Sequence, residues 1–471
     1  MAHGGSATVG TLAAPGTLAA ILKEFYISPI QEQLNNSVMV LELMQKTTVD
    51  WNGRVAIIPV HLARNAGVGF RAESGALPDA EHQGYDRLQI TSAYLYGRFQ
   101  VTGPAMASAG KGGANSFIGW MDSEMKKLVN DVKNESDRAM VSGGRVLGYI
   151  NEHMLKDAAP NPRTYQFFGD LERIEELNTL TQGVPAVDLR LEVIRLDTYA
   201  VVPTPVNPFI TVNSTNIATR TFTLANLAAN NLDLSLGGPN AIPDGVALAI
   251  RVANTQGNAA ADAICDVLDS QPVGIFGNLS DPTLFTVDRT TATALANNTG
   301  VDNLQSTALT MAITGDHIQT DIGVQRIQAV MDTLLNISGT EPNIILMSPL
   351  QRQMYASLFQ LTAAAAAAGP NAVQNVSGER STQFNAGFSG LSYGAMPLKT
   401  SRHVANGGLI FMKTDTWKLL ELEPHGFADV DGDVLLRVLN RDSYEGFYRW
   451  YYNTACVQPN RNAILAGLTL Q

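Results

Sequence analysis

The sequence predicts an α+β protein of several regions, and three patterns support this prediction. The longest helical pattern runs from Asn115 to Met140. Strand-like runs at residues 55–62 and 88–101 precede it, and they are separated by a glycine-rich stretch. From residue 320 onward, a helical pattern, a short apolar strand and a second helical pattern follow one another. Since the periodicity changes between these stretches, helices and strands are expected to alternate in blocks along the chain.

The helical pattern at 115–140 has one apolar face, because its apolar residues recur at steps of three and four. Asn115 or Ser116 is expected to cap the helix, and Gly143-Gly144 to end it. At about 1.5 Å per residue such a helix is roughly 39 Å long. The apolar face consists of Phe117, Met121, Met125, Leu128 and Val132.

Composition limits the possible classes of protein. The chain has 471 residues, 45% of them hydrophobic and 16% charged, so it can bury a sizeable core. Its formal charge of −11 argues against a surface that wraps nucleic acid through overall positive charge. Cys265 and Cys456 lie far apart, so we expect neither a disulfide scaffold nor a zinc site. We also expect no signal peptide and no membrane span.

The first part of the sequence contains two segments that we expect to pack against another protein surface. Residues 17–44 read as one or two short amphipathic helices that include Phe25 and Tyr26, with too little apolar surface to fold alone. The runs 55–62 and 88–101 predict a long two-stranded extension, and residues 64–79 form its glycine-rich tip. Because an isolated hairpin is only marginally stable in water, this one is expected to lie on another surface.

The remaining elements follow in order. Residues 145–177 are expected to hold one or two helices, and 188–253 a small β module of short strands. A helix at 320–337, a strand at 343–347 and a helix that begins at Ser348-Pro349 indicate an α/β arrangement. Further strands are expected at 396–399, 409–412, 417–421 and 444–452.

Motifs for catalysis or cofactor binding are weak. Gly110-Lys111-Gly112 lacks the spacing and the hydroxyl residue of a phosphate-binding loop. Gly390-Leu-Ser392-Tyr-Gly394 lacks the strand before it and the helix after it that a nucleophile elbow needs. Asp429-Val-Asp-Gly-Asp433 lacks the remaining ligands of a calcium loop. The seven histidines form no metal-binding spacing, so we expect no enzyme, no metal and no cofactor.

Three segments, taken in this order, resemble the major capsid proteins of tailed bacteriophages, the Hong Kong 97-like fold. They are TSAYLYGRFQVTGPAMASA before the helix that ends in SDRAM, then EPNIILMSPLQRQMYASL, and finally RWYYNTACVQPNRNAILAGL. With the elements between them, they span about two thirds of the chain.

The resemblance implies a division of the chain into named regions. Residues 1–44 would be the N-arm and 45–105 the extended β-hairpin loop. Residues 106–189, with the spine helix 115–140, would form a peripheral domain that continues at 256–319. An inserted β domain would occupy 190–255 and an axial α/β domain 320–440. Residues 441–471 would return as a strand to the peripheral domain.

The resemblance also implies a function. Such proteins assemble as hexamers and pentamers into an icosahedral shell around double-stranded DNA, within the bacterial host cytoplasm. The expected partners are further copies of the chain, a separate scaffolding protein, a portal, a possible decoration protein, and DNA through non-specific contacts. Some relatives join subunits through a loop lysine, but this loop has only Lys46 near its base, so no such cross-link is expected. The expected contact residues between subunits are Arg64, Phe70, Arg71, Glu73, Phe25 and Tyr26.

Two other functions stay open. An encapsulin-like compartment shares the fold and encloses protein cargo instead of a genome, so cargo inside purified shells would favour it. An enzyme with an unfamiliar α/β site is the second alternative, because catalytic groups often come together only in the folded chain. A soluble monomer with a deep polar pocket would favour the enzyme.

Overall fold

The computed structural model describes residues 39–47, 51–63, 65, 67–80, 82–104, 114–150, 164–182, 189–196, 201, 210–217, 220–224, 248–253, 268–288, 307–310, 322–366, 391–394, 396–428 and 435–468. These residues belong to two compact units. The first contains residues 93–137 and 421–452, and the second contains the other described residues. Of the helices predicted within 17–44, only α2 (Val40–Leu43) lies among the described residues.

A pair of long strands forms the centre of the first unit. β5 (Ala93–Thr102) runs antiparallel to β21 (Ser443–Cys456), in a register that pairs Tyr94 with Tyr451 and Phe99 with Gly446. β19 (Trp417–Phe427) and β20 (Leu436–Arg437) flank β21. The aromatic strand predicted at 444–452 is confirmed. Side chains alternate between the two faces, so Phe99, Tyr448 and Trp450 are buried while Tyr96 is exposed.

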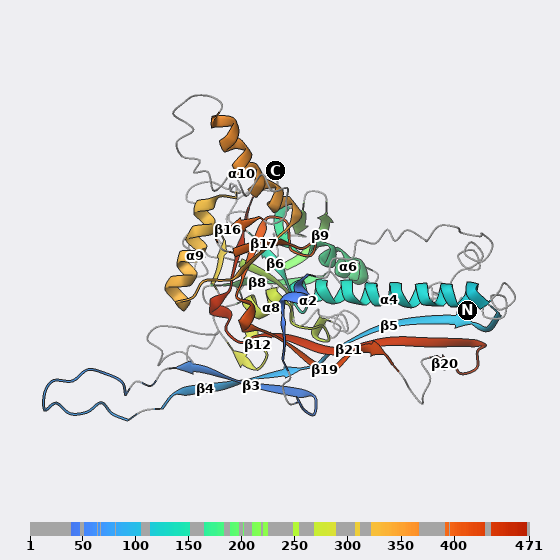
Figure 1. Ribbon diagram of the computed structural model, residues 1–471, viewed down its shortest axis with the longest axis horizontal. Coiled ribbons are helices and arrows are strands. Elements are labelled where there is room, and N and C mark those ends of the chain that lie inside the picture. Colours follow the sequence, from blue (N-terminus) through green and yellow to red (C-terminus); the bar gives the residue numbers. More distant parts are fainter. Residues whose placement is uncertain are drawn as a thin grey trace. The chain divides into compact units, whose positions relative to one another are not determined.

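The predicted spine helix is confirmed as α4 (Ala114–Ser142), which lies along β5 and β21 in Figure 1. It begins one residue earlier than expected, so Asn115 and Ser116 lie in its first turn and not at its cap. Its predicted end is correct, because the Gly143 N–H donates to the Ala139 carbonyl at 2.8 Å. Gly144 follows with a φ of +79°, a left-handed conformation that glycine adopts without steric cost.

Gly97 allows β5 and α4 to approach each other closely. A Cβ atom at this position would lie 2.8 Å from Val132 Cγ2 and 3.0 Å from Leu128 Cδ1. Val132 is buried and Leu128 is partly buried, in agreement with the predicted apolar face of the helix. The glycine therefore removes a side chain from the place where the helix ridge meets the sheet.

In the second unit, the predicted hairpin forms from β3 (Val55–Ala63) and β4 (Gly84–Thr91), with β2 (Trp51–Asn52) beside β3. The run predicted as one strand at 88–101 is two strands, because β4 ends at Thr91 and β5 starts at Ala93. The short strand β1 (Gln45–Thr47) pairs in parallel with the start of β19.

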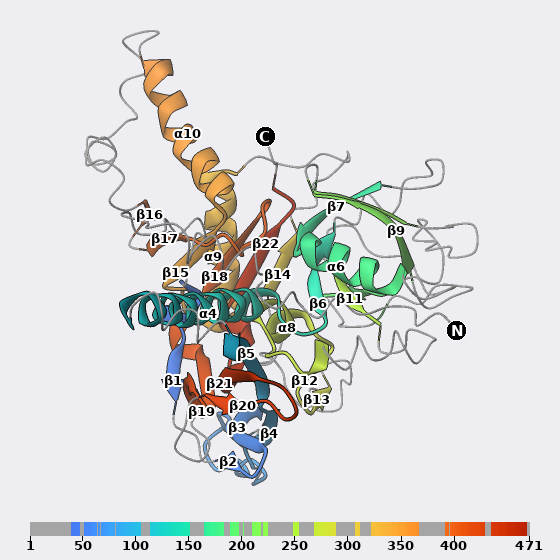
Figure 2. The ribbon, with the colours of Figure 1, turned by 90° about the vertical axis from the view of Figure 1, so that its right-hand side faces the viewer.

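The β module is a closed six-stranded barrel in the order β10-β7-β6-β11-β8-β9. The predicted strand-like runs are confirmed as β8 (Arg190–Arg195), β10 (Thr221–Leu224) and β11 (Leu248–Val252). β9 (Ile210–Asn216) lies between β8 and β10. Helix α6 (Leu171–Gln182) contributes Leu171, Ile174 and Leu177 to the barrel's apolar core, and Figure 2 shows it beside β7.

The prediction of only helices at residues 145–177 is wrong. β6 (Val146–Ile150) and β7 (Thr164–Gly169) precede α6 and complete the barrel. The barrel thus begins at Val146, well before residue 190, where the inserted β domain was expected to start. β6 is buried along its whole length, so it lacks the alternation of a half-exposed strand. Gly148 faces Gly169 so closely that a Cβ on Gly148 would lie 2.5 Å from the Gly169 Cα.

A six-stranded sheet forms the other large part of the second unit. Its order is β14-β22-β18-β15-β17-β16, with parallel and antiparallel neighbours. The strands predicted within 343–412 are confirmed at its centre. β22 (Ala463–Ala466) and β14 (Thr307–Thr310) also join it, from outside the range 320–440. The central strands are β15 (Ile344–Met347), β17 (Met396–Thr400) and β18 (Gly408–Met412), and β16 (Ser392–Tyr393) forms one edge.

Helices α9 (Val324–Ser338) and α10 (Pro349–Ala366) confirm the predicted helix, strand, helix order. α9 buries Ile327, Val330 and Leu334 in the core of the sheet and ends at Gly339, whose φ is +69°. At the start of α10, the Ser348 hydroxyl accepts a hydrogen bond from the Gln351 N–H at 3.2 Å. Pro349 takes the first helical position, where no N–H is needed.

The described part of the second unit also contains several short elements. They are α8 (Ile275–Ser280), the two-strand hairpin β12 (Thr283–Leu284) with β13 (Val287–Asp288), and the 3₁₀ turn Pro459–Arg461. All six residues of α8 are buried. The turn before β19, Thr414–Thr416, is also a 3₁₀ turn.

Candidate assembly interface

The extended hairpin buries only one of its faces. On that face Ala56, Val60, Leu88 and Ile90 are buried against Leu284 and Val287 in one apolar cluster. On the other face Ile57 is 39% exposed and Tyr85 is 70% exposed. Because residues alternate along each strand, the buried and exposed sets lie on opposite sides of the ribbon. The hairpin therefore has a fixed base and an open outer surface.

The loop between the two strands exposes large apolar side chains. Val68 is 70% exposed, Leu77 is 85% exposed, and Phe70 is fully exposed at 103%. Figure 1 shows this loop continuing the ribbon beyond β3 and β4. An isolated exposed apolar side chain is ordinary, but three in one loop form a patch that water solvates poorly.

Local hydrogen bonds shape the loop. The Gly67 N–H donates to Asn65 Oδ1 at 2.7 Å, and the Gly75 N–H donates to the Ala72 carbonyl at 2.9 Å. Arg71 Nη1 donates to the Phe70 carbonyl at 3.3 Å. These contacts bend the backbone into turns and leave the apolar side chains outside.

Three of the predicted contact residues, Phe70, Arg71 and Glu73, lie together in this loop, and all three are exposed. The structure thus brings these three close to one another. The other three, Arg64, Phe25 and Tyr26, lie outside the described residues.

A second exposed aromatic group, which the sequence did not single out, lies on β5 and β21. Tyr94 and Tyr451 are directly opposite each other, with ring centroids 5.1 Å apart in an edge-to-face contact. The Tyr96 hydroxyl donates to the Tyr451 hydroxyl at 3.0 Å. The alternation of tyrosines at 94 and 96 was the available signal, since it places both on one face of a strand.

The hydrogen bond from Tyr96 to Tyr451, together with partial burial, raises the pKa of Tyr96 to about 12. In the unfolded chain this phenol would lose its proton near pH 10. The folded chain then binds the proton more tightly, so we expect the free energy of unfolding to fall as pH rises from about 10 to about 12. Denaturant unfolding of wild type and Tyr96→Phe across this pH range would check this expectation. The free energy of unfolding should fall less steeply with pH in the variant than in wild type.

The ionisation of Tyr96 itself can be isolated by ultraviolet difference titration of wild type against Tyr96→Phe. The same difference measured in the Tyr451→Phe background removes the hydrogen bond. We expect the Tyr96 transition to move down toward pH 10 in that background. An unchanged transition would mean that the hydrogen bond does not set the pKa.

The motifs weighed for catalysis do not form a recognisable site among the described residues. Ser392 lies in the edge strand β16, where its carbonyl accepts from the Tyr355 hydroxyl at 3.5 Å, and not on a turn between a strand and a helix. Within the described part of the chain, no group of three or more His, Cys, Asp or Glu side chains could hold a metal ion. The segments 110–112 and 429–433 lie outside the described residues.

A cavity of about 480 Å³ lies at one side of the barrel. Its polar lining includes Arg145 and Arg251, and each arginine is paired with a carboxylate, Asp269 for Arg145 and Glu192 for Arg251. Both charges are thus already neutralised. No helix in the described part of the chain combines the length and the apolarity that a membrane crossing requires.

Comparison with known proteins finds similar solved structures at low sequence identity. No family model and no curated protein matches the chain. Among solved structures, it is similar to the "Cyanophage A-1(L) capsid asymmetric unit", with 9% identity, 97% of this chain and 99% of that chain covered, and a TM-score of 0.47. It is also similar to "Gordonia phage Cozz", with 11% identity, 99% and 96% coverage and a TM-score of 0.42. "The capsid of Myoviridae Phage XM1" follows with 10% identity, 95% and 97% coverage and a TM-score of 0.43.

Proposed function

We propose that this chain is a structural shell protein, the major capsid protein of a tailed bacteriophage. The observation that carries the proposal is the one-sided hairpin with Val68, Phe70 and Leu77 exposed at its tip. A closed shell repeats one contact between identical chains many times, so a small surface gains strength through multivalency. The resemblance of the three sequence segments, in their order along the chain, supports a bacteriophage shell in particular.

In this proposal the loop tip binds a neighbouring copy of the chain. Burial of the three apolar side chains supplies the driving force, at about 25 cal/mol for each Å² removed from water. Arg71 and Glu73 lie between them and would set the orientation of the contact through charge. The same proposal includes assembly as hexamers and pentamers in the host cytoplasm, and the expected division into N-arm, peripheral and axial regions. Its further partners are a scaffolding protein, a portal, a possible decoration protein and enclosed DNA, which the shell contacts non-specifically.

The first experiment measures the mass of the purified full-length chain by light scattering, with negative-stain imaging of the largest species. Closed hollow particles or regular capsomers of megadalton mass support the shell. A chain that stays monomeric, alone and with its scaffolding protein supplied, contradicts it. Protein cargo inside the particles, in place of DNA, would identify an encapsulin-like compartment.

Two loop variants test the role of the tip. We expect Phe70→Ser to lower the yield of assembled particles at least tenfold, because it removes the most exposed apolar side chain of the loop. Arg71→Glu is expected to weaken assembly as well, because it reverses the charge where a neighbouring copy should bind. Particle yield in sedimentation gradients is the measurement.

The matched control is Ala76→Ser, a small change at an exposed position of the same loop. It should assemble normally. Phe70 is fully exposed in the single chain, so Phe70→Ser should leave the free energy of unfolding within about 0.5 kcal/mol of wild type. Normal particle yield from both Phe70→Ser and Arg71→Glu would exclude the loop as the assembly contact.

A further inference from the structure

The extended hairpin rests on the short hairpin β12–β13. Leu284 and Val287 belong to the same apolar cluster as Leu88 and Ile90 of the extended hairpin. The Thr286 hydroxyl also donates to the Arg87 carbonyl at 3.4 Å. β12–β13 therefore forms part of the support under the extended hairpin, together with Leu420 and Ala455 of the same cluster.

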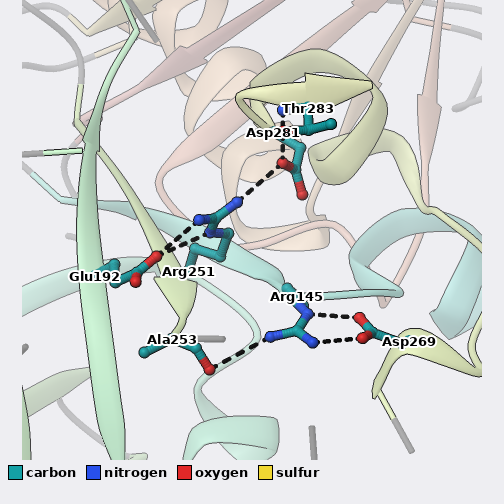
Figure 3. Close-up of polar contacts among 7 residues, drawn as sticks. All are labelled: Arg145, Glu192, Arg251, Ala253, Asp269, Asp281 and Thr283. Atoms are coloured by element: carbon teal, nitrogen blue, oxygen red, sulfur yellow. Dashed lines mark hydrogen bonds and ion pairs between the residues drawn. The ribbon is translucent and has the colours of Figure 1, made fainter. Parts of the chain in front are cut away.

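A single arginine joins the barrel to the start of β12. Arg251 on β11 lies directly opposite Glu192 on β8, and its Nη2 and Nε donate to Glu192 Oε2 at 2.8 and 3.2 Å. Its remaining Nη1 donates to Asp281 Oδ1 at 3.1 Å. Figure 3 shows the guanidinium between the two carboxylates. The planar fork of arginine suits this double role, whereas a lysine ammonium presents a single charged atom.

Asp281 passes this contact on to the hairpin. Its Oδ1 also accepts from the Thr283 N–H at 3.0 Å, which fixes the first residue of β12. The preceding residue, Ser280, shares a hydrogen bond of 2.6 Å with the Tyr149 hydroxyl of β6. The end of α8 is thus attached to the barrel. Through its hydrogen bond with the Thr283 N–H, Asp281 then fixes the path of the chain from α8 into β12.

The ion pair of Arg251 with Asp281 lies beside a cavity that both the barrel and the short hairpin line. The cavity of about 480 Å³ is lined by Arg251 on the barrel side and by Asp281, Thr283 and Phe285 on the hairpin side. Arg251 and Glu192 are each only 9% exposed, so water screens their attraction weakly. Across this cavity, the ion pair of Arg251 with Asp281 joins barrel strand β11 to the segment that enters β12.

We propose that Arg251 and Asp281 are positioning residues for the extended hairpin, and that the barrel holds this hairpin at its working angle through them. The barrel then serves as a support for the assembly contact and is more than a surface module. The consequence for assembly rests on the proposed function, but the effect on the hairpin itself does not.

The decisive variant is Asp281→Asn, which removes the charge opposite Arg251 and keeps an oxygen for Thr283. Hydrogen exchange in the full-length chain is the measurement. We expect the backbone amides of β3 and β4 to exchange about tenfold faster, because a charge-assisted hydrogen bond is replaced by a neutral one. The amides of β15 and β18 in the six-stranded sheet should keep their wild-type rates.

Asp269→Asn is the matched control. It removes the carboxylate of the Arg145 pair, which lines the same cavity, but Asp269 precedes α8 whereas Asp281 follows it and leads into β12. Exchange in β3 and β4 should stay at the wild-type rate. Arg251→Lys is expected to fall between wild type and Asp281→Asn, since it keeps the charge and loses one arm of the fork.

Unchanged exchange of β3 and β4 in Asp281→Asn overturns the proposal, and so does equal acceleration in β15 and β18, which would indicate general destabilisation. Particle yield of the same variants is measured separately. Faster exchange in β3 and β4 with normal assembly supports the positioning role and counts against the hairpin as the assembly contact. Failure of the two ideas can thus be told apart.

Discussion

Replacing Asn462 with leucine is expected to lower the free energy of unfolding by about 3–5 kcal/mol, the largest effect that we foresee for a single side chain. Asn462 is fully buried. Its Oδ1 accepts from the Lys413 N–H and from Trp417 Nε1, both at 2.9 Å. Leucine has nearly the same shape but no polar atom, so it leaves these buried donors without an acceptor.

The other half of the same amide adds to the loss. Asn462 Nδ2 donates to Thr416 Oγ1 and to the Gln458 carbonyl, both at 3.1 Å. Each unsatisfied buried group costs about 1–3 kcal/mol, and removal of one partner leaves the other desolvated. The amide joins the turn before β19 to the segment before β22, two stretches that are far apart in sequence.

Denaturant unfolding measures this effect, with Asn336→Leu as the control. Asn336 is an exposed amide on α9, so the same chemical change there should stay within about 0.5 kcal/mol. Asn462→Asp gives a further check, because it keeps an acceptor for Trp417 and loses the amide donors. Equal midpoints for Asn462→Leu and Asn336→Leu would show that the buried amide contributes little.

The second large effect is expected at Gly97, where Gly97→Val should destabilise the first unit by about 2–4 kcal/mol. In an open strand this change would normally favour folding, because valine suits extended backbone and glycine does not. Here a Cβ would lie 2.8 Å from Val132 Cγ2, so α4 has to move away from β5. The predicted sign is therefore opposite to that of strand propensity.

Gly426→Val is the matched control, since Gly426 lies in β19 of the same unit and a Cβ there would have no neighbour within 4 Å. It should be neutral or slightly stabilising. Thermal unfolding of the two variants, followed by tryptophan fluorescence, compares them directly. If Gly97→Val proves as stable as Gly426→Val, the helix and the strand are not in tight contact at this position.

Long elements with clear signals could be predicted from the sequence. α4 has a regular apolar face along its length, and α9, β15 and α10 are separated by Gly339 and by Ser348-Pro349. These signals are local, since they depend on periodicity and on residues with special backbone needs. For the same reason the predicted run 55–62 matches β3 closely, whereas the predicted run 88–101 starts inside β4 and continues through β5.

β6 and β7 could not be predicted, because their conformation depends on partners elsewhere in the chain. β6 is a short, fully buried apolar run, which reads equally well as part of a helix. It is a strand because it pairs with β11, about a hundred residues later, and because Gly148 and Gly169 lie face to face. Such distant pairing leaves no local trace in one sequence.

The candidate site likewise has features with a local sequence signal and features that depend on residues far apart in the sequence. The exposure of Phe70, Arg71 and Glu73 followed from their place in a glycine-rich loop. The link through Arg251 was missed, because Glu192 and Asp281 are distant in sequence. A signal was present, since Arg251 is a charge within the apolar run GVALAIRV, and a buried charge requires a partner.

The alternation of the two faces where β3 and β4 pack on the core also limits how this protein can change its length during evolution. One inserted or deleted residue within either strand would turn Ala56, Leu88 and their neighbours to the opposite side of the ribbon. Changes by two residues preserve the two faces and only lengthen or shorten the reach of the hairpin. The loop at 67–80 has no such parity rule, so it is the place where length can vary freely among descendants.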